Sequence, residues 1–131
     1  MTAHAINDVA RFMSLGGQTV PSFPEPAVYL EDSLPFVRRV QEEVTEAMNA
    51  DDTPELVDAF LDIAYAAFTG AIRFAGEEKA LEAWEAISKA NLSKVDGSLG
   101  PVRRNSDGKI LKPEGFKHPD IEEVLFPSEG D

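Results

Sequence analysis

The sequence contains no cysteine, and this absence excludes several classes of protein. Without thiols the chain has no disulfide scaffold, no zinc knuckle and no cysteine nucleophile, and the composition fits a reducing compartment. No run of 18 residues lacks charge, and the N-terminus has no signal-like apolar core. The sequence therefore predicts no membrane span, and we expect a soluble, cytoplasmic protein.

Positive charge is also scarce, because 12 Lys and Arg oppose 24 Asp and Glu, for a net charge of -12. Such an acidic chain is unsuited to sequence-independent nucleic-acid binding, which needs a positive surface. The basic residues are concentrated in residues 89–118, which carry a net charge of +4, while the remainder carries -16. Two interpretations remain open: the basic segment neutralises the acidic body, or the acids hold cations while the basic segment meets an anion.

The chain has 131 residues, of which 43% are hydrophobic, and this predicts one domain with a core. Apolar periodicity predicts helices over residues 4–15, 32–49, 54–75 and 77–92. We expect an all-α bundle of four to five helices, with an N-terminal helix and proline-rich connector (1–30), a helical core (31–94) and an irregular C-terminal arm (95–131). Asp107-Gly108 predicts a short hairpin within that arm.

Helix boundaries follow from capping residues and prolines. Asp32 or Ser33 is the expected N-cap of the second helix, with Pro35 in its first turn. Thr53 is the expected N-cap of the third helix, with Pro54 in the first helical position. Residues 54–75 are apolar on all sides, so we expect this helix to be buried in a bundle. It is too apolar for a monomer of four short helices, which predicts a homo-oligomer.

Two acidic pairs carry the chemical signal. Asp58 and Asp62 are four residues apart and share one face of an apolar helix, while Glu43 and Glu46 share a face of the preceding helix. A tight turn joins these helices, so the two pairs lie at similar depth along a hairpin. Four facing carboxylates repel, and an octahedral Mg²⁺ ion, or Mn²⁺, would relieve this repulsion. Taken alone, Glu43 and Glu46 also fit an ordinary solvated face.

The pattern resembles that of a known family. Glu42-Glu43-x-x-Glu46, a turn and Asp58-x-x-x-Asp62 on an apolar helix are similar to motifs of the all-α nucleotide pyrophosphohydrolases. These comprise the MazG-like enzymes, the dimeric dUTPases and the phosphoribosyl-ATP pyrophosphohydrolases. Further segments resemble a small single-domain branch common in actinobacteria and phages: Phe12-Met13-x-x-x-Gly17-Gln18, residues 58–65, Asn91-Leu92-Ser93-Lys94, residues 107–113 and Pro119-Asp120-Ile121.

The resemblance implies a role for each acid. Glu43, Glu46 and Asp62 would be metal ligands, and Glu42 would be a further ligand or would orient water. Glu42 or Glu43 would take the proton from the attacking water. The family usually has Glu-x-x-Asp in the third helix, and here Ala59 stands at the Glu position, so we expect Asp58 to supply the missing oxygen. The residues expected to contact phosphate or nucleotide are Asn91, Lys94, Lys109 and Lys112.

The implied activity is Mg²⁺-dependent hydrolysis of a nucleoside triphosphate to the monophosphate and pyrophosphate. We expect a deoxynucleoside triphosphate substrate, with dGTP as the specific candidate, and a dimer or a dimer of dimers. If the protein is phage-encoded, the expected location is the host cytoplasm. Two alternatives stay open: phosphoribosyl-ATP pyrophosphohydrolase, and a non-catalytic helical module that binds nucleotides or regulates a partner.

Overall fold

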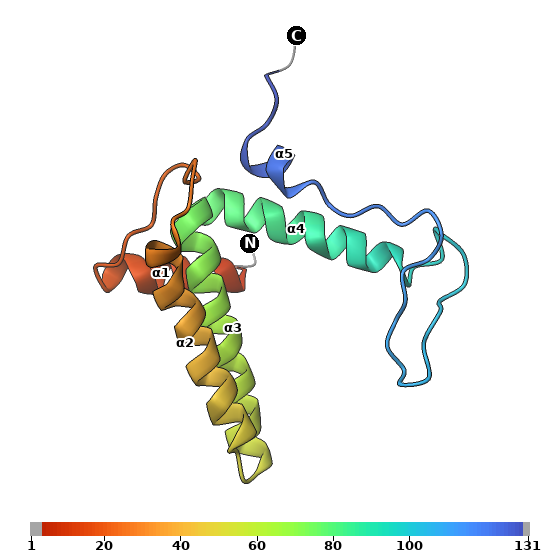
Figure 1. Cartoon of the computed structure of the whole chain (residues 1–131), viewed down its shortest axis with the longest axis horizontal. Helices are drawn as coiled ribbons and strands as arrows, with labels where there is room; N and C mark the ends of the chain where they lie inside the picture. The colour runs from red at the N-terminus through yellow and green to blue at the C-terminus, as the bar shows by residue number, and fades with distance from the viewer. Residues whose placement is uncertain (1–3, 130–131) are drawn as a thin grey trace. The chain divides into compact units, whose positions relative to one another are not determined.

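The computed structural model describes residues 4–129, which form an all-α structure, as the sequence predicted. Its five helices are α1 (Ala5–Leu15), α2 (Leu30–Met48), α3 (Thr53–Ala75), α4 (Glu77–Ser93) and α5 (Ile121–Leu125) (Figure 1). Within the described range no strand forms, and none of these helices is long and apolar enough to cross a membrane.

The chain divides into two compact units, one up to Ala80 and the other from Leu81 onward. The boundary falls inside α4, whereas the sequence suggested one core reaching residue 94 and a separate arm.

The first unit is built on a hairpin of α2 and α3, with α1 packed on α3 (Figure 1). The largest fully buried side chains are Ile6, Val9 and Met13 of α1 and Ile72 of α3. Gly70 of α3 faces α2, since a Cβ at this position would lie 3.6 Å, an ordinary contact distance, from the Cβ of Phe36.

The proline-rich connector is fastened to the end of α3. The backbone N–H of Glu25 donates to the carbonyl of Phe74 at 2.8 Å, and the Glu25 carboxylate pairs with Arg73 at 3.0 Å. Gly76 ends α3 with a φ of 83°, and a Cβ there would lie 2.6 Å from the carbonyl oxygen of Pro21. Only glycine allows this approach, so the connector runs directly over the α3–α4 junction.

Two helix starts differ from the expectation. The predicted N-cap of α2 was wrong, because the helix begins at Leu30 after an extended Tyr29 whose carbonyl accepts from the backbone of Asp32 and Ser33. Pro35 consequently lies inside the helix, beyond its first turn. The N-cap of α3 is Asp52 rather than Thr53, since the Asp52 carboxylate accepts from the backbone N–H of Glu55 at 2.9 Å.

The all-round burial expected for α3 is not achieved within one chain. The buried residues of α3 are Ala59, Ala66, Ile72 and Ala75. The large apolar residues of its first half, Leu56, Val57, Phe60 and Leu61, are exposed. The physical reason is that α1 and α2 are the helices that pack extensively on α3, and they cover only part of its circumference.

The second unit contains the predicted hairpin as a single isolated bridge without strands. Arg104 and Ile110 form an isolated antiparallel bridge, and the backbone N–H of Leu111 donates to the carbonyl of Arg103 at 2.8 Å. The turn passes through Gly108, whose φ is 82°. The short helix α5, whose N-cap Asp120 accepts from the backbone of Glu123, was not expected from the sequence.

Candidate functional site

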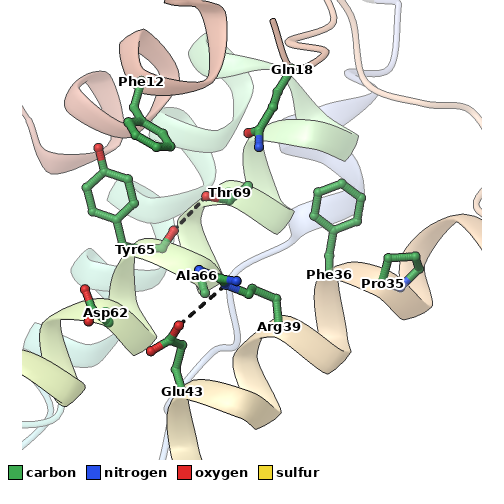
Figure 2. Close-up of a pocket in the computed structure, with 10 residues that line it drawn as sticks. All are labelled: Phe12, Gln18, Pro35, Phe36, Arg39, Glu43, Asp62, Tyr65, Ala66 and Thr69. Atoms are coloured by element: carbon green, nitrogen blue, oxygen red, sulfur yellow. Dashed lines mark hydrogen bonds and ion pairs between the residues drawn. The ribbon is translucent and has the colours of Figure 1, made fainter. Parts of the chain in front are cut away.

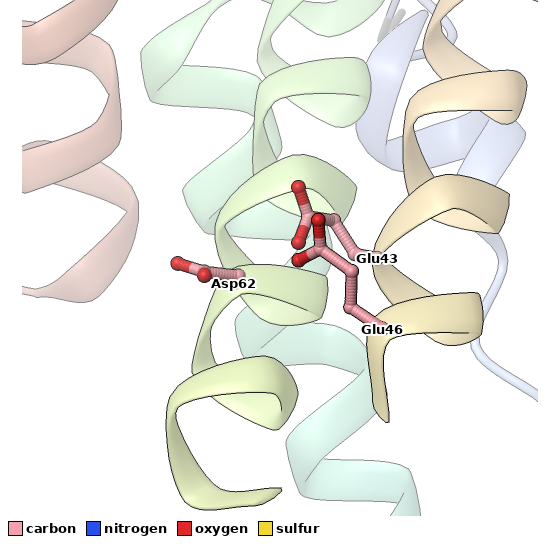
Figure 3. Close-up of side chains that lie close together, drawn as sticks. All are labelled: Glu43, Glu46 and Asp62. Atoms are coloured by element: carbon pink, nitrogen blue, oxygen red, sulfur yellow. The ribbon is translucent and has the colours of Figure 1, made fainter. Parts of the chain in front are cut away.

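The hairpin brings three carboxylates together. Glu43 and Glu46 lie one turn apart on α2, and Asp62 lies on the facing helix α3. One oxygen from each residue lies within 4.8 Å of the others, and Figure 3 shows the two glutamates leaving α2 toward α3. The matched depth predicted from the short turn is thus found for these three acids.

Glu43 is the buried member of this group. Only 7% of the residue is exposed, and its Oε2 atom is buried without a hydrogen-bond partner. Its Oε1 atom lies 3.5 Å from Nε of Arg39, the preceding turn's arginine on α2. The alternative of an ordinary solvated face is therefore wrong for Glu43, whereas Glu46 and Asp62 are exposed.

The surroundings of Glu43 oppose its ionisation. Burial is the largest cause that raises the pKa of its carboxyl, followed by the hydrogen bond to Glu46 and the charge of Glu46. Asp62 also raises this pKa, and Arg39 lowers it without cancelling the other effects. A buried carboxylate with these neighbours is stabilised either by a proton or by an added cation.

The donor set fits a hard divalent cation. Mg²⁺ and Mn²⁺ prefer oxygen ligands, and the three residues offer carboxylate oxygens only. The buried Oε2 atom of Glu43, which lacks a partner, is the observation that argues for a ligand here. Glu43, Glu46 and Asp62 are therefore the residues that could hold such an ion.

Asp58 is not brought into this group. It lies one turn before Asp62 and is exposed, whereas the neighbouring Ala59 is 5% exposed and buried. The position where the resembling family carries a glutamate thus holds a methyl group in the buried face of α3. Consecutive helical residues point about 100° apart, so Asp58 does not project where a side chain at Ala59 would, and it lies one turn, about 6 Å, along α3 from Asp62.

Glu42 also lies outside the three-acid group. Its side chain is 68% exposed, and its Oε2 atom lies 3.8 Å from the guanidinium of Arg39. Arg39 therefore stands beside both Glu42 and Glu43, the two acids expected to act on water.

A pocket of about 620 Å³ opens beside the acids (Figure 2). Glu43, Asp62 and Arg39 line it together with three aromatic residues, Phe12, Phe36 and Tyr65. The remaining lining residues are Gln18, Pro35, Ala66 and Thr69. The sequence interpretation missed the pocket roles of Phe36 and Arg39, because nothing in a periodic α2 pattern distinguishes the residues that face a cavity.

Two of the predicted phosphate-contacting lysines are brought together in the second unit. The ammonium groups of Lys94 and Lys112 lie 5.0 and 6.0 Å from the ring centre of Phe116. Nζ of Lys112 lies 3.1 Å from Nε2 of His118, a residue for which the sequence suggested no role. Asn91 is exposed near the end of α4 and Lys109 is exposed in the hairpin. Contact of these four predicted residues with a nucleotide stays a prediction.

No protein-family model matches this chain, and no curated protein matches it. The resemblance to the pyrophosphohydrolases therefore depends on the motifs quoted above.

A thermal-shift experiment tests which acids bind a cation. At free Mn²⁺ 100-fold above its Kd, we expect the wild-type protein to gain about 2.7 kcal/mol of stability. Asp62→Asn should lose most of this gain, because it removes one of the three converging carboxylates. Asp58→Asn should retain it, and Asp51→Asn, an exposed acid in the α2–α3 turn, is the matched control. Loss of the shift in Asp58→Asn would instead support the sequence-based prediction for Asp58.

The raised pKa of Glu43 predicts an unusual pH dependence in the absence of metal. The group binds its proton more tightly in the folded than in the unfolded chain, whose reference value is 4.5. The stability from this group is thus complete below pH 4.5 and is lost as the pH rises through the folded-state pKa. In EDTA, Glu43→Gln should therefore lose less stability than wild type between pH 4.5 and 7.5, measured by urea unfolding.

The exposed neighbour Glu42 supplies the control for that comparison, since Glu42→Gln removes the same charge one residue away. Its pH profile should follow that of wild type. If the stability of Glu43→Gln and of wild type changed with pH in the same way, the folded structure would not raise the pKa of Glu43, and the prediction would be wrong.

Proposed function

We propose that the protein hydrolyses a nucleoside triphosphate to the monophosphate and pyrophosphate with Mg²⁺ as its cofactor. The observation that supports this most directly is the buried, unpartnered Oε2 atom of Glu43 among three converging carboxylates. The 620 Å³ pocket beside these acids adds room for an organic substrate, which a purely structural cation site would not need.

Glu43, Glu46 and Asp62 are the proposed ligands. When bound, Mg²⁺ would neutralise phosphate oxygens and lower the pKa of a coordinated water. The three acids would hold the triphosphate's cation at the mouth of the pocket, and their mutual repulsion would be relieved at the same time.

The reaction needs a base for the attacking water. Water attacks the α-phosphorus. The bond between this phosphorus and the oxygen that bridges it to the β-phosphorus breaks, and pyrophosphate leaves. Glu42 lies outside the ligand group, and its exposed carboxylate, 3.8 Å from the guanidinium of Arg39, would accept the water's proton. Arg39, which contacts Glu42 and Glu43 and lines the pocket, would offer its guanidinium to a phosphate oxygen.

A panel of nucleotides tests the activity. The canonical ribo- and deoxynucleoside triphosphates and dUTP are each supplied with Mg²⁺. We expect pyrophosphate and monophosphate, without orthophosphate, from a narrow set of them that includes dGTP. Asp62→Asn should lower kcat/KM by at least about 100-fold, an effect at least as large as the loss of a residue that orients a metal ligand. Asp51→Asn should keep the wild-type kcat/KM.

Two results would contradict the proposal. Release of orthophosphate would place the cleavage at another bond. No turnover with Mg²⁺ or Mn²⁺ would favour phosphoribosyl-ATP as substrate or a non-catalytic module, for which the buried Ala59 in place of the family's glutamate is the supporting observation.

We further propose that the protein is a homo-oligomer, a dimer or a dimer of dimers. The support is the exposed apolar surface on the first half of α3, where Phe60 is 58% and Leu61 is 65% exposed. Adjacent α2 residues Val44 and Met48 are exposed as well. Apolar side chains clustered on one element are characteristic of a protein–protein interface.

Light scattering after gel filtration tests this assembly. Wild type should have at least twice the mass of one chain, and Phe60→Glu should shift it to monomer, because a buried charge opposes association. Phe23→Glu introduces the same charge at an 80% exposed connector residue and should leave the mass unchanged. A monomeric wild type at micromolar concentration would contradict the proposal.

A further inference from the structure

The pocket beside the acids has two chemically different ends. Glu43 and Asp62 lie at one end, and Phe12 and Gln18 lie at the other (Figure 2). Arg39, which pairs with Glu43, belongs to the acidic end, and Tyr65, which packs on Phe12, belongs to the aromatic end. A ligand that spans the pocket would therefore need an anionic group at one end and a different chemistry at the other.

The volume of the pocket points to an organic ligand. Its 620 Å³ falls within the range of about 300–1,000 Å³ found for small-molecule sites and is far larger than a hydrated ion requires. The acids account for only one end of that space. The other end is the part of the pocket that the cation site leaves unexplained.

That other end offers aromatic surface. Phe12 of α1 and Tyr65 of α3 pack edge to face, with ring centres 5.5 Å apart and planes at 88°. This contact fixes the two rings, yet Phe12 remains 58% exposed, so much of its surface is available to a ligand. Flat rings stack on such surfaces with little dependence on their substituents.

Gln18 adds a hydrogen-bonding group beside the rings. Its backbone N–H donates to the carbonyl of Met13 at 2.8 Å, which fixes the residue just after α1. Across the described residues, no hydrogen bond is formed by its side-chain amide. A side-chain amide can donate and accept hydrogen bonds at once, which suits the polar edge of a heterocycle. An aliphatic ligand would shield the amide from water and form no hydrogen bond with it.

We propose that this end of the pocket binds the heterocyclic base of a nucleoside, with Phe12 as the stacking surface and Gln18 as the group that recognises the edge of the base. The inference rests on the proposed function, because the phosphate chain of the same ligand would then lie toward Glu43 and Asp62. Phe12 determines affinity for any base, and Gln18 determines the preference among bases.

Binding of free nucleosides tests this inference without any phosphate chemistry. Deoxyadenosine, deoxyguanosine, deoxycytidine and thymidine are titrated into the ¹⁵N-labelled full-length protein in EDTA, with deoxyribose as the control for the sugar. At least one nucleoside should shift the side-chain amide signal of Gln18. The amide of Gln41, the chain's other glutamine and an exposed residue of α2, is the internal control and should not respond.

Variants separate the two roles. Phe12→Ala should weaken nucleoside binding by about tenfold or more, as expected for the loss of one stacking partner, while Phe23→Ala should not weaken it. Gln18→Ala should change the ranking of the four nucleosides. Equal affinities for Phe12→Ala and Phe23→Ala, an unresponsive Gln18 amide, or binding of deoxyribose as tight as that of the nucleosides would each overturn the inference.

Nucleoside binding and pyrophosphate release are independent readouts, so the base subsite and the proposed activity can fail separately. Nucleoside binding at Gln18 without pyrophosphate release from any triphosphate would retain the base subsite and reject the proposed activity. Pyrophosphate release without a response at Gln18 would retain the activity and reject this subsite.

Discussion

The rest of the site depends on the burial of one carboxyl group, that of Glu43. The α2–α3 hairpin removes Glu43 from water and places it beside Glu46 and Asp62, and Arg39 meets only one of its two oxygens. Burial and like charge both raise its pKa, so the hairpin destabilises the ionised form of this carboxyl. The proposed cation would relieve both effects, and in its absence a proton would.

The remaining elements of the first unit build a pocket around that carboxyl. α1 supplies Phe12, and the segment after α1 supplies Gln18, while the connector is held to the end of α3 by Glu25 and Arg73. Gly76 permits the close passage of Pro21 over the helix junction. The proline-rich segment is thus a structural part of the first unit, because its ion pair and backbone hydrogen bond fix its course.

The apolar residues of α3 differ in burial between the two halves of the helix. Its second half is buried against α1 and α2 through Ala66 and Ile72, and this half stabilises the unit. Its first half exposes Phe60 and Leu61, which therefore add less to the stability of a single chain. The burial on all sides that the apolar pattern predicted is thus not met within one chain, and the proposed oligomer is the arrangement that would bury the remainder.

The sequence by itself determined the all-α class, the four long helices and the pairing of acids on facing helices, because apolar periodicity and a short turn are local properties. It also indicated Glu43, Glu46 and Asp62, since spacing alone places acids on one helical face. Only the tertiary structure decided that Asp58 lies outside the group and that Glu43 is the buried member of it, because these outcomes depend on how α2 and α3 are placed along and against each other. The tertiary structure alone also decided the pocket, since Phe12, Phe36 and Tyr65 come from three helices and meet only when those helices pack.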